Sequence, residues 1–197
     1  DFFQSGGTYD RNRPFHTTIS PSMDILISSN LERLLFLVSG YNDAMVADLM
    51  QQLKETGKYS VPADVFAKIG SQFEGGFCDD AQTKQTIAKL FDEKKYLADT
   101  HTAVAVKVYE DYQARTGDTT PTVIASTASP FKFCQSVISA LGGTVTSDGT
   151  ELLDQLHAMT GAPIPAPLAA LAGLKPRFDL VIDRENILNT VDLLGQI

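Results

Sequence analysis

The feature that most constrains the fold is a change of pattern at residue 96, after which short apolar runs alternate with helical patterns. The clearest run covers residues 121–127, where apolar and β-branched residues lie between turn signals. Shorter runs cover 96–99 and 178–182. Helical patterns follow these runs at 100–115, 131–141 and 183–194. Because strands that alternate with helices are typical of a parallel sheet, the sequence predicts an α/β fold with a short, mostly parallel sheet flanked by helices.

The part of the chain before residue 96 has helical patterns with clear end signals. Asn42 precedes a pattern over 43–56 that stops at Gly57. Asn is favoured at helix N-caps, and Gly is favoured just after the last turn. Further helical patterns cover 63–69 and 80–94. We therefore expect a loop and helix, then a helical insertion, then an α/β part, at 1–41, 42–95 and 96–197.

Residues 20–33 carry a polar loop onto the start of an apolar helix. Ser29 and Glu32 have the S-x-x-E spacing of a capping box, in which each side chain binds the backbone N–H of the other residue. The unpaired N–H groups of a helix start attract anions, so an anion site is one interpretation. A capped core helix without a ligand is the other interpretation.

Charge and composition exclude several function classes. The formal net charge of −8 argues against nucleic acid, and against an anionic membrane, as the main partner. Two cysteines and three histidines are too few for a disulfide scaffold or a typical zinc site. No apolar run has the length of a membrane span, and the first residues lack a signal-peptide pattern. We therefore expect a cytoplasmic protein without a metal ion.

Polar residues follow two of the predicted strands at their carboxyl ends, where ligands bind in open α/β sheets. The two ends are Asp99-Thr100-His101-Thr102 and Ser126-Thr127-Ala128-Ser129. We expect Thr100 or Thr102 to cap the next helix after the first end, and Ser129 to do so after the second.

The side chains at these strand ends suggest a ligand site without defining a reaction. The hydroxyls of Ser126 and Thr127 suit a ring nitrogen or an oxyanion, and His101 is either a ligand contact or a structural histidine. The chain has no G-x-G-x-x-G, P-loop, H-E-x-x-H or nucleophile-elbow motif. The sequence therefore shows no self-contained catalytic set.

Five motifs, in their order along the chain, resemble those of threonine synthases. They are Gly7-Thr8-Tyr9-Asp10, Ser20-Pro21-Ser22-Met23-Asp24-Ile25, Ser29-Asn30-Leu31-Glu32-Arg33, Asp99-Thr100-His101-Thr102-Ala103-Val104-Ala105 and Ser126-Thr127-Ala128-Ser129-Pro130-Phe131-Lys132-Phe133. Over essentially its whole length, the chain resembles the C-terminal portion of these enzymes. The family has the type II fold of pyridoxal-phosphate enzymes and converts O-phospho-L-homoserine and water to L-threonine and phosphate.

The resemblance also implies roles for individual residues. Ser126 and Thr127 would bind pyridoxal 5′-phosphate, with Thr127 near the pyridine nitrogen. The residues implied to surround the substrate are Ser20, Asn30, Arg33 and His101. No catalytic residue is expected in this chain, because the Schiff-base lysine of the family lies upstream of Asp1. Lys132 does not replace it, since Lys132 occupies the lysine position of the family's T-A-x-P-x-K-F segment.

The resemblance implies that the chain is a fragment of a pyridoxal-phosphate-dependent lyase of threonine biosynthesis. The fragment alone would be inactive, and its partner would be the missing N-terminal part of the same enzyme. Its interrupted sheet would expose apolar surface and favour self-association. Two alternatives stay open: a threonine-synthase-like phospho-lyase with a related substrate, and a non-catalytic interaction domain.

Overall fold

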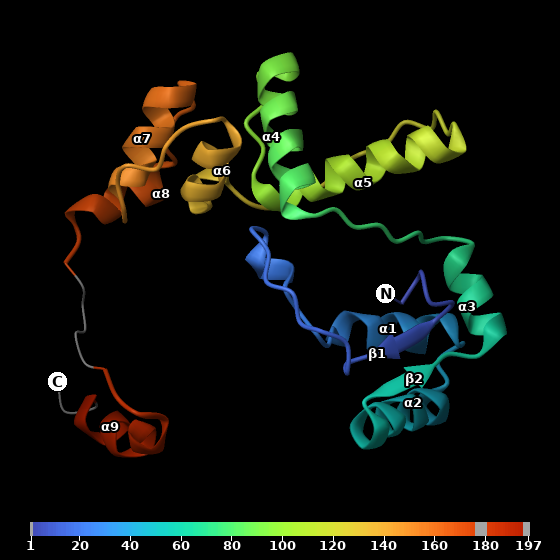
Figure 1. The fold of residues 1–197 in the computed structure, drawn as a ribbon. Helices are drawn as coiled ribbons and strands as arrows, with labels where there is room; N and C mark the ends of the chain where they lie inside the picture. The colour runs from blue at the N-terminus through green and yellow to red at the C-terminus, as the bar shows by residue number, and fades with distance from the viewer. Residues whose placement is uncertain (1, 176–180, 195–197) are drawn as a thin grey trace.

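Helices make up most of the regular backbone in the computed structural model, which describes residues 2–175 and 181–194 (Figure 1). The α-helices are α1 (Ser29–Val38), α2 (Asp43–Thr56), α3 (Ala63–Gly70), α4 (Asp80–Lys94), α5 (Thr100–Thr116), α6 (Cys134–Ala140), α7 (Glu151–Thr160), α8 (Ala166–Ala169) and α9 (Ile187–Leu194). The 3-10 helices are η1 (Pro21–Met23), η2 (Pro130–Lys132), η3 (Ala170–Gly173) and η4 (Arg184–Asn186). Within the described ranges, no helix is both long and apolar enough to cross a membrane.

The starts of α2 and α4 agree with the helical patterns predicted over 43–56 and 80–94, and each start has a polar cap. The Asn42 side chain accepts a hydrogen bond from Met45 N at 2.9 Å, and Gly57 ends α2 in the left-handed region at φ 80°. At the start of α4, the Asp79 carboxylate accepts from Gln82 N, and the Gln82 side chain accepts from Asp79 N. Local sequence signals are therefore sufficient to place these two helices.

The predicted capping box at the start of α1 is wrong. The helix begins at Ser29 itself, and the N-cap residue, Ser28, forms no side-chain cap bond. The Tyr9 hydroxyl instead accepts a hydrogen bond from Ser28 N at 2.6 Å and donates to Leu26 O at 3.1 Å. This contact from a distant residue holds the chain at Ser28, so the helix starts one residue before the predicted position, and Glu32 does not complete a capping box.

A short antiparallel pair of strands forms in two segments where no strand is predicted from the sequence. β1 (Thr8–Asp10) pairs with β2 (Lys58–Ser60), and Tyr9 lies opposite Tyr59. The two tyrosine rings stack with their centroids 5.4 Å apart. Because alternation over three residues carries little signal, a pair of strands this short is hard to find in a sequence.

The predicted parallel sheet is not formed within the part of the chain that the structure describes. Residues 96–99 and 121–127 run without strand partners, and Val123 is 95% exposed. An apolar extended run becomes a strand only when a neighbouring strand pairs with its N–H and C=O groups. Most of the predicted strand at 178–182 lies outside the described residues.

Among the described residues, two hydrophobic clusters form the core, one around α1–α3 and one around α4–α7. The buried residues of the first cluster are Phe2, Leu35, Val46, Leu49, Leu53, Tyr59, Val61, Val65 and Ile69. Those of the second are Ile87, Ala103, Phe131, Cys134, Val137, Ile138, Leu152, Leu153 and Leu156. The first cluster contains residues from both sides of the predicted boundary after residue 41. The division into 1–41, 42–95 and 96–197 stays a prediction.

The loop that contains η1 connects these two groups of helices. Figure 1 shows it extending from α1 toward the region where α4, α5 and α6 meet. A backbone N–H of this loop donates to Asp80, the first residue of α4, and another donates to His101 in the first turn of α5. The loop therefore places residues 18–24 beside the predicted site residue His101.

Candidate functional site

The buried carboxylate of Asp99 organises the start of α5. Its Oδ1 accepts from the backbone N–H of His101 at 2.8 Å and from that of Thr102 at 3.3 Å. Its Oδ2 accepts from the Thr102 hydroxyl. Asp99 is thus the N-cap of α5, and the predicted cap by Thr100 or Thr102 is wrong. Asp99 occupies the N-cap because its carboxylate accepts hydrogen bonds from two of the unpaired N–H groups at the helix start.

His101 lies where three segments of the chain meet, and its side chain is only 12% exposed. Its Nδ1 lies 3.1 Å from Asp99 Oδ1, and its Nε2 accepts from Ser22 N at 3.3 Å. The imidazole packs against the Phe133 ring at a centroid distance of 4.7 Å. The ring thus joins the first turn of α5 to the loop at 18–24 and to the segment before α6.

The loop at 18–24, which holds the predicted site residue Ser20, is closed by its own hydrogen bonds. Thr18 N donates to Asp24 Oδ2, and Thr18 Oγ1 donates to Asp24 Oδ1, each at 2.7 Å. Ser20 Oγ lies 3.0 Å from Thr18 Oγ1, and Ser20 N donates to the same oxygen at 3.2 Å. Ser20 is therefore held beside the loop closure and is partly accessible.

The two predicted hydroxyl residues of the second strand end have different surroundings. Ser126 Oγ accepts from Tyr96 OH at 3.0 Å and lies 3.0 Å from Thr102 Oγ1. Because Thr102 also bonds to Asp99, Ser126 is connected to the same carboxylate. Thr127 is exposed, and among the described residues its hydroxyl has no hydrogen-bond partner. The structure thus joins both predicted strand ends and leaves Thr127 accessible to a ligand.

Asn30 and Arg33 lie away from this cluster, near the start of α1, and both are exposed. Arg33 Nη1 lies 3.5 Å from Asn30 Oδ1, at the limit of a hydrogen bond. Arg33 also lines a groove of about 830 Å³ beside α1 and α2, together with Glu32 and Asp43. Among the described residues, no hydrogen bond or ion pair joins His101 to a residue that lines this groove.

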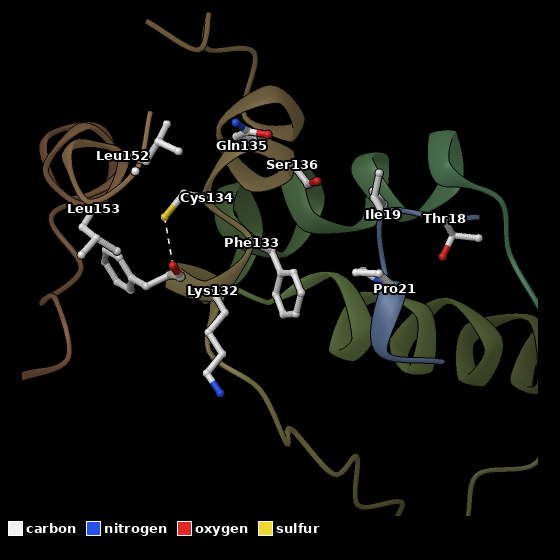
Figure 2. A pocket seen from close by; sticks show the side chains of 12 residues that line it. Thr18, Ile19, Pro21, Lys132, Phe133, Cys134, Gln135, Ser136, Leu152 and Leu153 are labelled. Atoms are coloured by element: carbon white, nitrogen blue, oxygen red, sulfur yellow. Dashed lines mark hydrogen bonds between the residues drawn. The ribbon is translucent and has the colours of Figure 1, made fainter. Parts of the chain in front are cut away.

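A second cavity, of about 420 Å³, lies between residues 18–21, residues 131–136 and α7 (Figure 2). The Cys134 thiol lines it and donates to Phe131 O at 3.1 Å. Burial raises the pKa of this thiol, so Cys134 is unsuited to nucleophilic catalysis. Figure 2 shows the Lys132 side chain extending away from Cys134.

The sequence points to His101, Ser126 and Thr127 as candidate site residues but does not predict the contacts that hold them. Asp99 is a candidate from sequence alone, because an Asp directly before a helix is a preferred cap. Nothing local to Tyr96 or Thr102 predicts their contacts with Ser126, which lies 30 and 24 residues away. Within the described ranges, no group of three or more His, Cys, Asp and Glu side chains is arranged to hold a metal ion.

Comparisons with known proteins give one consistent result. A family model described as "Threonine synthase, C-terminal" matches residues 102–191. The threonine synthase of Pseudomonas aeruginosa is 38% identical over 138 residues, which are 70% of this chain and 29% of that protein. The chain spans about 30% of the length of the first curated relatives that it matches.

Solved structures agree with the sequence comparison. The crystal structure of threonine synthase from yeast matches with a TM-score of 0.81 at 30% identity, covering 100% of this chain and 40% of that one. A structure described as PLP-bound threonine synthase from Brucella melitensis matches with a TM-score of 0.67 at 37% identity, covering 80% of this chain and 32% of that one. These matches confirm the predicted type II fold, although the parallel sheet predicted with it is not formed among the described residues. The chain is homologous to the C-terminal portion of threonine synthases, which have the type II fold of pyridoxal-phosphate enzymes.

Proposed function

We propose that this chain is the C-terminal part of a threonine synthase, which converts O-phospho-L-homoserine and water to L-threonine and phosphate. The observation that carries the proposal is the cluster around Asp99, which joins Ser126 to His101 and, through Ser22, to the loop at 18–24. These are the segments whose motifs resemble the cofactor and substrate segments of the family. The 38% identity to a threonine synthase supports the same assignment.

At the second strand end, Thr127 is the residue best placed to contact pyridoxal phosphate. Its hydroxyl is exposed and has no partner among the described residues, and a hydroxyl can donate to a ring nitrogen. The hydrogen bonds of Ser126 with Tyr96 and Thr102 fix the backbone directly before Thr127. When bound, the cofactor accepts electrons from the bonds at the substrate α carbon. The PLP-bound structure from Brucella melitensis supports this assignment.

The substrate needs donors for two anionic groups, its phosphate and its carboxylate. In the proposal, the substrate site is bordered by Ser20 and by His101, which holds the loop at 18–24, and Asn30 and Arg33 supply donors from α1. Because α1 lies away from the Asp99 cluster, both sets serve one substrate only when the N-terminal part of the enzyme completes the cavity. That part also supplies the lysine that holds the cofactor.

The test is a product assay on the full-length protein that carries this chain, supplied with pyridoxal phosphate and O-phospho-L-homoserine. The proposal expects threonine and phosphate in equal amounts. A 2-oxo acid in place of threonine would favour a related phospho-lyase, and an absence of turnover would refute both assignments. The 197-residue chain alone is expected to make no threonine, and borohydride is expected to trap no cofactor on its lysines.

A matched pair of variants tests the assignment of Thr127. Thr127→Ala removes the hydroxyl proposed to face the pyridine nitrogen. We expect a several-fold loss of cofactor affinity in the full-length protein, because a neutral hydrogen bond contributes about 1 kcal/mol. Thr122→Ala is the control, since Thr122 is an exposed threonine of the same segment whose hydroxyl donates to Thr120 O. Equal affinities for the two variants would contradict the role of Thr127.

A further inference from the structure

We propose that Asp99 is a positioning residue that keeps the proton of a neutral His101 ring on Nδ1, so that Nε2 can accept the Ser22 N–H and hold the loop at 18–24 against α5. The arrangement depends on one buried carboxylate, which is 1% exposed. It explains why a charged group lies inside the fold at this position. The inference deepens the proposed function, because it concerns the same site, but its structural basis is independent of the reaction.

The hydrogen-bond partners at the two ring nitrogens require the same tautomer. A backbone N–H can only donate, so the nitrogen that faces Ser22, at 3.3 Å, must be the unprotonated Nε2. A carboxylate can only accept, so the nitrogen that faces Asp99, at 3.1 Å, must carry the proton. Thr100 Oγ1, 3.4 Å from the same Nδ1, can accept as well. The opposite tautomer would place two donors face to face at Ser22.

Packing restricts the ring to this orientation. The imidazole lies against the Phe133 ring and is largely shielded from solvent. Asp99 Oδ1 is itself fixed, because it also accepts from two backbone N–H groups at the start of α5. A second contact, from Ile19 N to Asp80 Oδ1 at 3.1 Å, attaches the loop to α4. The loop therefore has one attachment that depends on the histidine tautomer and one that does not.

The consequence for the proposed enzyme is an ordered cavity wall. Ser20 lies two residues before Ser22, so the contact with His101 fixes the position of a residue assigned to the substrate cavity. Asp99 Oδ2 reaches Ser126 through the Thr102 hydroxyl. The Asp99 carboxylate thus positions His101 and the loop at 18–24 through Oδ1. Through Oδ2 and Thr102 it positions Ser126, next to the residue proposed to face the cofactor.

Two substitutions separate the capping role of Asp99 from the positioning role. Asp99→Ser keeps a good N-cap, but its shorter side chain does not reach His101 Nδ1. Asp99→Asn keeps a carbonyl oxygen at the Oδ1 position and places its NH₂ toward the Thr102 hydroxyl, which can accept. We therefore expect Asp99→Ser to lose the tautomer preference, and Asp99→Asn to retain it.

The experiment uses the full-length protein with ¹⁵N-labelled histidine, under conditions where the ring of His101 is neutral. Long-range ¹H–¹⁵N spectra report which ring nitrogen carries the proton, and mass spectrometry reports hydrogen exchange at the Ser22 amide. The wild type and Asp99→Asn are expected to show the proton on Nδ1. Asp99→Ser is expected to show mixed tautomers and roughly three- to tenfold faster exchange at Ser22, as for loss of one hydrogen bond.

Two further variants keep the test decisive if Asp99→Ser does not fold. His101→Phe keeps the packing on Phe133 but removes the acceptor, so Ser22 should exchange faster to the same extent. Asp80→Ala should loosen Ile19 and leave the His101 proton on Nδ1. The proposal is refuted if His101 carries its proton on Nε2 in the wild type, or if neither Asp99→Ser nor His101→Phe changes exchange at Ser22. Because neither readout needs turnover, a protein that makes no threonine would refute the proposed function alone.

Discussion

Replacing Thr102 by Val tests whether the Asp99 cluster stabilises the fold as a connected network. Thr102 is 3% exposed, and its hydroxyl lies between Asp99 Oδ2 and Ser126 Oγ. Valine has nearly the same shape but no hydroxyl, so the buried carboxylate loses one donor. Because hydrogen bonds to charged groups contribute about 1.5–3 kcal/mol, we expect the free energy of unfolding to fall by about 2 kcal/mol.

The matched control is Thr86→Val on α4. Thr86 is 4% exposed, and its hydroxyl donates to Gln82 O at 2.8 Å, a carbonyl of its own helix. No charge and no second segment is involved, so we expect a change below about 1 kcal/mol. Urea unfolding followed by circular dichroism measures both variants in one buffer. A loss for Thr102→Val no larger than that for Thr86→Val would refute the account of Asp99.

Three further predictions follow from individual side chains. Asn42→Ala should lower stability by about 1 kcal/mol, because Met45 N loses its cap; thermal unfolding unchanged from wild type would contradict this. Burial raises the pKa of Tyr59 above its ordinary value of about 10, so the folded chain should lose stability as the pH rises beyond that value, where the unfolded chain ionises first. Denaturant titrations should show that Tyr59→Phe reduces the fall in stability at high pH. An unchanged fall would contradict the role of Tyr59. Iodoacetamide should label the partly exposed Cys78 well before the buried Cys134, as peptide mass mapping would show; equal rates would contradict the burial of Cys134.

Predictions from sequence succeeded where the physical cause is local. Asn42 and Asp79 bind N–H groups within three residues of themselves, so the patterns around them are enough to place α2 and α4.

Predictions failed where a distant residue decides the outcome. Ser29 does not act as the predicted cap, because Tyr9 holds the preceding residue from 19 positions away. The contact between Ser22 and His101 spans 79 residues, and no local pattern reports it. The run at 121–127 has the composition of a strand, but strand pairing depends on a neighbour that the described residues do not provide.

The central claim is that this chain completes an enzyme that eliminates phosphate and then adds water at the β carbon of O-phospho-L-homoserine. The most direct measurement is the reaction of the full-length protein in H₂¹⁸O, followed by mass spectrometry of both products. The account predicts threonine with ¹⁸O in its hydroxyl group and phosphate without ¹⁸O from the solvent, because the C–O bond breaks. Homoserine with ¹⁸O-labelled phosphate would show hydrolysis at phosphorus and would contradict the account.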